Sequence, residues 1–191
     1  MTETTRAGFA AVIGAPNAGK STLVNRLVGS KVSIVTQKVQ TTRFPVRGVA
    51  MAREAQIVLV DTPGIFKPRR SMGERLNETA IGSVAGVDTV CLVLDATMPL
   101  GKGDRFVAER VPRDTVVVVN KTDIASPEKI LLQRSKAAEL DLSAYFPVSA
   151  QTGQGVDALV EELVARMPEG PLYYPEDMVT DVPEAFWVAE L

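Results

Sequence analysis

Short apolar runs alternate with stretches of helical periodicity along most of this chain. The largely apolar segments 9–13, 87–95 and 115–119 have the length of buried strands. Apolar residues recur every three or four positions over 23–28 and 156–167, which indicates helices packed on a sheet. The alternation predicts an α/β fold with a mainly parallel sheet.

Two further predicted strands, 44–53 and 55–61, have a single residue between them. So short a connection predicts an antiparallel hairpin. With a short strand at 145–148, the sheet has six strands and is mixed. The remaining predicted helices carry apolar residues from Met72 to Val84, lie around Phe106 to Val111, and run from the N-cap Ser126 to about Leu140.

The segment 14–21 fits the phosphate-binding pattern G-x-x-x-x-G-K-[ST] and lies between a predicted strand and a predicted helix. Gly14 and Gly19 leave bare backbone, so that successive N–H groups form an anion nest at a helix N-terminus. Lys20 reaches the β- and γ-phosphates, and Ser21 offers a hydroxyl to Mg²⁺. A glycine-rich turn is the alternative, and both flanks argue against it. The residues are Gly14, Ala15, Pro16, Asn17, Ala18, Gly19, Lys20 and Ser21, followed by Thr22.

This motif and the alternating elements predict a P-loop NTPase, a doubly wound three-layer α/β/α domain with a six-stranded mixed sheet and one antiparallel strand. We expect the domain to occupy residues 1–168. Proline and glycine at 168–171 end the last helix, and the acidic, aromatic segment 169–191 is expected to be a linker packed on the domain.

Two polar segments, 61–64 and 120–123, follow predicted strands and suit a nucleotide site. An aspartate at 61 can hold Mg²⁺ through water, and a glycine at 64 can bring an N–H to the γ-phosphate. A carboxylate at 123 can accept two donors from guanine that adenine lacks. Each segment alone is also an ordinary turn. The residues are Asp61, Thr62, Pro63, Gly64, Asn120, Lys121, Thr122 and Asp123.

Two shorter segments complete a set of five that could form one nucleotide site. Ser149 and Ala150 follow the last predicted strand, where backbone could touch the guanine base. Thr41 and Thr42 precede Arg43 in a polar loop, where a hydroxyl could complete the Mg²⁺ shell when the γ-phosphate is present. The order and spacing of all five segments make coincidence negligible.

Composition excludes several classes of site. The 191 residues include no histidine, which excludes His-based zinc sites and catalytic triads. Cys91 is the single cysteine and lies in an apolar run, so we expect a buried thiol and no intrachain disulfide. A net charge of −2 gives no general electrostatic footprint for nucleic acid. The short polar N-terminus lacks a signal-peptide core, and no apolar run is long enough to span a bilayer, so a cytoplasmic location is expected.

Segments 14–23, 40–43, 61–65 and 173–181 resemble the Era family, within the translation-factor-related GTPases that carry five G motifs. The last segment, Tyr-Tyr-Pro-Glu-Asp-Met-Val-Thr-Asp, is the most specific, because in that family it joins the G domain to a C-terminal KH domain. The resemblance covers essentially the whole chain and stops where the KH domain would begin. It implies a G domain plus linker without the RNA-binding module.

The resemblance implies hydrolysis of GTP to GDP and phosphate, with Mg²⁺ held by Ser21, Thr42 and Asp61. It implies that Asn120 and Asp123 bind guanine, that Lys121 stacks under the ring, and that Ser149 and Ala150 complete the base pocket. The residues it places at the reacting phosphate are Lys20, Asn17, Thr42 and Gly64.

Ile65 stands where Ras-like enzymes carry a water-orienting glutamine, so we expect slow intrinsic turnover. In similar proteins the asparagine at the position of Asn17 helps to hold a K⁺ ion, and a local loop-capping role is the alternative. Phe44 and Phe66 depart from the more polar residues expected in relatives, which leaves the detail of the switch loops open.

The implied partners are the small (30S) ribosomal subunit and 16S rRNA, in whose assembly and maturation the family acts as a switch. Peripheral contact with the inner face of the cell membrane and a monomeric state are also expected by resemblance. Two other functions stay open: a nucleotide-binding module without useful turnover, and a related GTPase of tRNA modification or membrane transport.

Overall fold

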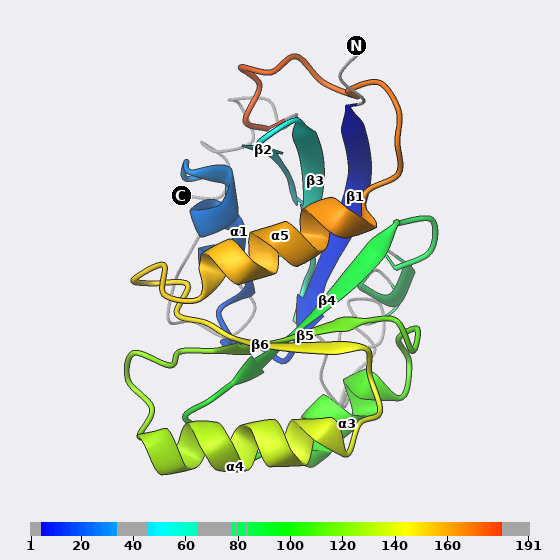
Figure 1. Ribbon diagram of the computed structural model, residues 1–191. Helices are drawn as coiled ribbons and strands as arrows, with labels where there is room; N and C mark the ends of the chain where they lie inside the picture. Colours follow the sequence, from blue (N-terminus) through cyan, green and yellow to red (C-terminus); the bar gives the residue numbers. More distant parts are fainter. Residues whose placement is uncertain (1–4, 34–45, 65–77, 79, 83, 181–191) are drawn as a thin grey trace, which may run out of the picture.

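The computed structural model describes residues 5–33, 46–64, 78, 80–82 and 84–180 (Figure 1). Six strands form one sheet in the order β2-β3-β1-β4-β5-β6. β2 is antiparallel to β3, and the other neighbours are parallel, which confirms the predicted mixed sheet. The strands are β1 (Arg6–Gly14), β2 (Val46–Ala52), β3 (Ala55–Asp61), β4 (Thr89–Asp95), β5 (Val116–Asn120) and β6 (Ala144–Pro147).

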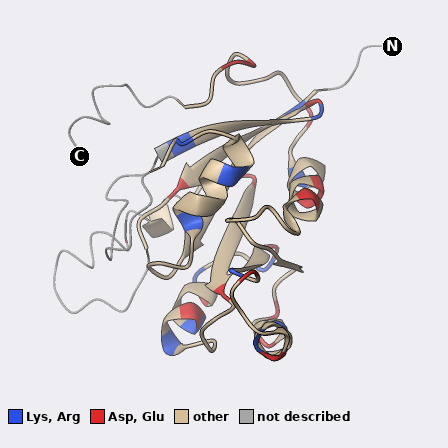
Figure 2. Cartoon of the chain, turned by 90° about the vertical axis from the view of Figure 1, so that its left-hand side faces the viewer, with Lys and Arg blue, Asp and Glu red and all other residues tan. Residues whose placement is uncertain are grey.

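Helices cover both faces of the sheet, as the predicted three layers require. The helices that lie wholly within the described residues are α1 (Lys20–Val28), α3 (Lys102–Ala108), α4 (Pro127–Ala138) and α5 (Val156–Arg166). Side chains of α1 and α5 join one apolar core, and side chains of α3 and α4 join the other. Successive strand residues point to opposite faces, so Val12 enters the first core and Ile13 the second. Lys, Arg, Asp and Glu lie mainly on the helices, the loops and the strand ends (Figure 2).

Two helix boundaries agree closely with the sequence pattern. Gly29 ends α1 in the left-handed region, with φ 77°, and its N–H donates to the carbonyl of Asn25. The Ser126 hydroxyl accepts from the N–H of Lys129 at 3.4 Å and caps α4.

The sequence pattern placed one helix too far along the chain. α3 begins at Lys102 and ends at Ala108, whereas the apolar residues suggested a helix reaching Val111. Its start is stabilised by the Asp104 carboxylate, which accepts from the N–H of Gly101 at 2.9 Å. A polar cap, which an apolar period does not reveal, therefore sets this boundary.

The segment 169–180 packs on the two strands at the antiparallel edge of the sheet. Gln56 in β3 is fully buried, and its side-chain oxygen accepts from the N–H groups of Tyr173 and Tyr174, both at 2.9 Å. Its side-chain nitrogen donates to the carbonyl of Tyr174 at 2.8 Å. Further along, the N–H of Val49 donates to Val179 at 2.9 Å. Gln56 thus anchors the segment by pairing with its backbone, and nothing in the sequence indicated this role.

Replacing Gln56 with leucine should lower the free energy of unfolding by about 1–3 kcal/mol, because buried backbone groups of Tyr173 and Tyr174 lose their partners. Urea denaturation measures the loss. Hydrogen exchange should also become faster at these two amides. Gln154→Leu, at an exposed position, is the control and should leave both measurements unchanged. Equal stability of Gln56→Leu and the wild type would contradict the anchoring role.

Candidate nucleotide-binding site

The predicted motifs gather at the carboxyl-terminal ends of the parallel strands. The P-loop follows β1, residues 61–64 end and follow β3, residues 120–123 end and follow β5, and residues 149–150 lie just after β6. All four strands are parallel, so their carboxyl ends lie at the same end of the sheet, which is where α/β proteins bind ligands.

Lys20 is held inside the P-loop. It is 7% exposed, and its ammonium group donates to the carbonyls of Ala15 at 2.9 Å and Gly14 at 3.3 Å. Burial lowers the pKa of Lys20 to about 8, although the negative charge of Asp61 acts in the opposite direction. A buried ammonium group that donates to loop carbonyls is well placed to turn to a polyanion.

The two P-loop glycines are required by packing as well as by ligand approach. A Cβ on Gly14, where φ is 150°, would collide with the carbonyl of Val93 in β4. A Cβ on Gly19, where φ is 98°, would collide with the side-chain amide of Asn120. Beyond the approach of phosphate, contacts with β4 and Asn120 therefore require glycine at these two positions.

Asn120 joins the P-loop to the loop that follows β6. The residue is 2% exposed. Its side-chain nitrogen donates to the carbonyl of Ala18 at 3.0 Å, and its side-chain oxygen accepts from the N–H of Ala150 at 3.0 Å. The family resemblance implies a base contact for Asn120, and the structure shows that its side chain also fixes two neighbouring loops relative to each other.

Asp123 lies beside Ser149. The Ser149 hydroxyl donates to the Asp123 carboxylate at 2.8 Å and accepts from the N–H of Thr152 at 3.0 Å. The N–H of Thr122 donates to Val148 at 3.2 Å, which ties the two loops together. The carboxylate predicted to read guanine is therefore held at a defined position by the loop predicted to flank the base.

Lys121 pairs with Asp95, a residue that the sequence analysis did not single out. Their side chains meet at 2.6 Å. Burial would raise the pKa of Asp95, but hydrogen bonds from Lys121 and Thr97 outweigh it and lower the pKa. Asp95 is in register with Asn120 on the neighbouring strand, so an acidic residue at the end of β4 was the signal available.

The predicted metal ligands that the structure describes are buried. Asp61 is 0% exposed and Ser21 is 8% exposed. A carboxylate and a hydroxyl are the hard oxygen donors that Mg²⁺ prefers, and Mg²⁺ commonly takes only one or two protein ligands beside phosphate and water. These residues therefore fit the ion. No cluster of three or more acidic, His or Cys side chains occurs in the described part of the chain to suggest another metal.

Gly64 lies directly against the P-loop. A Cβ on Gly64 would come within 2.9 Å of three atoms of Pro16, so only glycine fits this approach. The Thr62 hydroxyl donates to the carbonyl of Val12 at 2.9 Å and holds the preceding turn on β1. The predicted residues Thr42 and Ile65 lie outside the described residues, as do the positions of Thr41, Arg43, Phe44 and Phe66.

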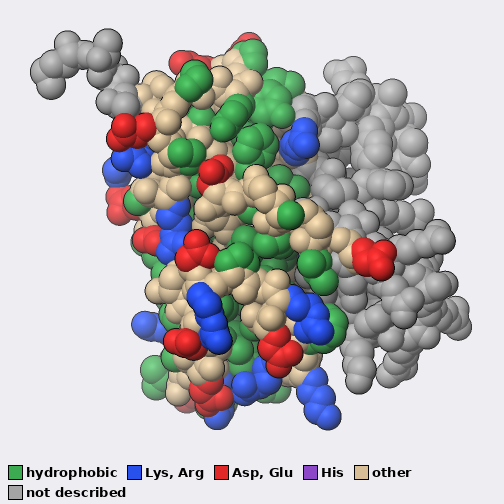
Figure 3. Space-filling model, turned by 90° about the vertical axis from the view of Figure 1, so that its right-hand side faces the viewer, with side chains coloured by type: hydrophobic (Ala, Val, Ile, Leu, Met, Phe, Trp, Pro, Cys, Tyr) green, Lys and Arg blue, Asp and Glu red, His purple; other side chains and the backbone are tan. Residues whose placement is uncertain are grey.

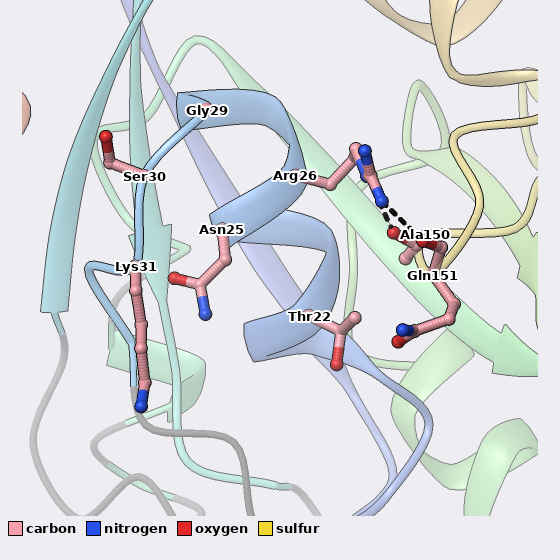
Figure 4. A pocket seen from close by; sticks show the side chains of 8 residues that line it. All are labelled: Thr22, Asn25, Arg26, Gly29, Ser30, Lys31, Ala150 and Gln151. Carbon is pink, nitrogen blue, oxygen red and sulfur yellow. Dashed lines mark hydrogen bonds between the residues drawn. The ribbon is translucent and has the colours of Figure 1, made fainter.

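A hollow of about 290 Å³ opens between α1 and the loop after β6 (Figure 4). This volume is at the lower end of the range for small-molecule sites. Two predicted nucleotide residues, Thr22 and Ala150, line it together with Asn25, Arg26 and Lys31. The hollow adjoins the predicted base pocket and brings the end of the P-loop motif and the base loop to the same cavity.

Asn25 and Arg26 were missed by the sequence analysis. The Asn25 side-chain oxygen accepts from the N–H groups of Val32 and Ser33, both at 2.8 Å. The Arg26 guanidinium donates to the carbonyls of Ala150 and Gln151. Both lie on the polar side of a helix whose apolar period alone was used in the sequence analysis.

A family model described as 50S ribosome-binding GTPase matches residues 9–121. Curated relatives include GTPase Era of Bradyrhizobium sp. strain BTAi1, 46% identical over 191 residues, which cover 98% of this chain and 62% of the relative. GTPase Era of Mycobacterium bovis is 44% identical, with 96% of this chain and 64% of the relative covered. The chain thus spans about 62–64% of the length of these two relatives.

Solved structures of Era are also similar to this chain. A variant of Aquifex aeolicus Era bound to GDP·AlF4⁻ matches with a TM-score of 0.88 at 36% identity, covering 97% of this chain and 65% of that one. Era in complex with MgGDPNP and nucleotides 1506–1542 of 16S ribosomal RNA matches equally well. The G domain of the Thermotoga maritima FeoB iron transporter, at 22% identity and a TM-score of 0.61, shares the fold.

The family model covers more than half of the chain, and the Era relatives extend the similarity over nearly all of it. The sheet order, the buried P-loop lysine and the joined base loops are those expected of such a domain. This chain belongs to the 50S ribosome-binding GTPase family and is an Era-like member of it.

Proposed function

We propose that this chain binds GTP and hydrolyses it to GDP and phosphate, with slow intrinsic turnover. The observation that carries the proposal is the pair of Asn120 hydrogen bonds, which set the P-loop and the base loop at a fixed separation. A ligand with phosphates at one end and a planar base at the other would contact both loops at once. The Era relatives solved with GDP·AlF4⁻ and MgGDPNP support it.

The chain's own residues would divide the work. The P-loop N–H groups and Lys20 bind the phosphates at the N-terminus of α1. Gly64, packed on Pro16, brings backbone beside the P-loop, where the γ-phosphate would lie. Bound Mg²⁺, held through Ser21, Thr42 and Asp61, would neutralise charge on the phosphate oxygens. Asp123, with Asn120 and Lys121, would select guanine.

The proposed biological role is a switch in small-subunit assembly and 16S rRNA maturation. It rests on the relative that was solved with 16S ribosomal RNA. The view in Figure 3 shows Lys and Arg interspersed with Asp and Glu and no continuous basic surface there. A face with charges mixed in this way would attract RNA only weakly.

We also propose that the chain acts in the cytoplasm as a monomer, and that any contact with the membrane is peripheral. Within the described residues, no helix has the length and apolar character needed to cross a bilayer.

A nucleotide-binding module without turnover is the other candidate function. A multiple-turnover phosphate-release assay with GTP decides between turnover and binding alone.

Replacing Asp123 with asparagine should weaken GTP binding and favour xanthosine triphosphate, whose 2-oxo group accepts a hydrogen bond from the new amide. The loss of charged hydrogen bonds to guanine should cost about 2–4 kcal/mol by calorimetry. The oxygen that accepts from Ser149 is retained, so the loop should keep its position. Asp114→Asn, at an exposed position before β5, is the control. Unchanged GTP affinity in Asp123→Asn would disprove the base assignment.

GDP affinity should fall as pH rises through about 8, because Lys20 has a pKa of about 8 and attracts phosphate only when protonated. Between about pH 7 and pH 8.5 the loss should be about fourfold, accompanied by proton uptake on binding. Calorimetry in buffers of different ionisation enthalpy measures both effects. Arginine stays charged in this range, so Lys20→Arg should remove the dependence. Proton uptake that persists in Lys20→Arg would assign the effect to another group.

If Asn17 holds K⁺ beside the transferring phosphoryl group, hydrolysis should be at least about tenfold faster in K⁺ than in Na⁺ at equal ionic strength. Asn17 is exposed and has a φ of 61°, so glycine removes its side chain without adding backbone strain. Asn17→Gly should hydrolyse GTP at the same rate in both salts. Equal rates for the wild type in the two salts would exclude the ion from the mechanism.

A further inference from the structure

Arg26 reaches from α1 to the loop after β6, as Figure 4 shows. Its Nε donates to the carbonyl of Ala150 at 2.9 Å, and its Nη2 donates to the carbonyl of Gln151. The guanidinium also packs beside Gly153, where an added Cβ would meet Nη1 at 3.8 Å. One side chain therefore holds two successive carbonyls of the loop predicted to flank guanine.

The peptide groups on either side of Ala150 are both held from outside the loop. Asn120 accepts from the N–H of Ala150, and Arg26 donates to its carbonyl. Asn120 also donates to Ala18 in the P-loop, and α1, which carries Arg26, begins at Lys20, within the P-loop motif. The contacts form a closed ring through the P-loop, Asn120, Ala150, Arg26 and α1.

The loop keeps its own shape through internal hydrogen bonds. The N–H of Gly153 donates to Ser149 at 2.8 Å, and the N–H of Ser149 donates to Gln154 at 2.9 Å. Gly153 and Gly155 have positive φ values of 92° and 75°, so the loop includes conformationally permissive positions. These contacts set the shape of the loop, whereas Arg26 sets its place relative to α1.

We infer that Arg26 is a positioning residue for guanine recognition. It holds the backbone of residues 149–151 at the separation from the P-loop that a nucleotide needs in order to meet both at once. The inference rests on the proposed function. Preorganisation of this kind avoids the cost of ordering a loop when the ligand binds. Arginine suits the task because its planar fork presents several donors in a fixed geometry, which lysine does not.

The position of Arg26 separates this role from a purely structural one. Arg26 is exposed, and contacts of exposed charged side chains contribute little to global stability. The loop lies on the base side of the site, whereas hydrolysis takes place at the phosphates. Loss of Arg26 should therefore act on substrate binding and leave both unfolding and the chemical step nearly unchanged.

The test compares Arg26→Ala and Arg26→Lys with the wild type. In Arg26→Ala the KM for GTP should rise about tenfold, the Kd for GDP should rise similarly, and kcat should stay within about twofold. Arg26→Lys retains the charge but not the fork and should give an intermediate KM. In the nucleotide-free protein, amide hydrogen exchange at residues 149–152 should become faster in Arg26→Ala, while the urea midpoint stays the same.

Arg113→Ala is the matched control. Arg113 is exposed and also donates to two successive carbonyls, those of Leu140 and Asp141, at 3.3 and 3.2 Å. It lies before the amino-terminal end of β5, whereas the nucleotide site lies at the carboxyl-terminal ends of the strands. This variant should change neither KM nor exchange at residues 149–152.

The two readouts fail independently. Unchanged loop exchange in nucleotide-free Arg26→Ala would overturn the inference whatever the protein binds. Faster exchange with an unchanged KM and Kd would show that Arg26 holds the loop without serving recognition, which also overturns it. A wild-type protein that neither binds GDP nor hydrolyses GTP would refute the proposed function, and the inference with it, even where exchange responds to Arg26→Ala.

Discussion

The site depends on one buried amide. Asn120 donates to the carbonyl of Ala18 and accepts from the N–H of Ala150, so a single side chain fixes the P-loop against the base loop. Leaving either of these buried backbone groups without a partner would cost about 1–3 kcal/mol. The close approach also explains Gly19, since a side chain there would occupy the place of the Asn120 amide. The geometry expected of a nucleotide site is thus present in the protein before any ligand is considered.

The parallel sheet makes this interaction available. β1, β4, β5 and β6 run in the same direction, so polar residues at their ends meet at one edge while apolar side chains fill the two cores behind them. The lysines at the carboxyl-terminal ends of these strands have polar or charged partners nearby. Lys121 pairs with Asp95, and Lys20 is solvated by the carbonyls of Gly14 and Ala15. Charges that are buried, like that of Lys20, or partly buried, like those of Lys121 and Asp95, are tolerated only where such partners exist.

A second buried amide, that of Gln56, lies near the amino-terminal end of β3, away from the nucleotide site. Gln56 pairs with the backbone of Tyr173 and Tyr174 and holds the segment 169–180 on the antiparallel edge. The edge strand β2 is partly covered as a result, through the bond between Val49 and Val179. Covering a free edge in this way protects a sheet from pairing with other chains.

The sequence by itself determined the P-loop, the order of strands and helices, the antiparallel hairpin and the residues at the strand ends, because each depends on local periodicity or on a short motif. The tertiary structure alone revealed the contacts between Arg26 and Ala150, between Gln56 and Tyr174, and between Lys121 and Asp95. The first two join residues 124 and 118 positions apart, and hydrogen bonds over such distances leave no period in the chain. They arise only when the sheet has brought the strand ends together, since a side chain's partner is set by its neighbours in space.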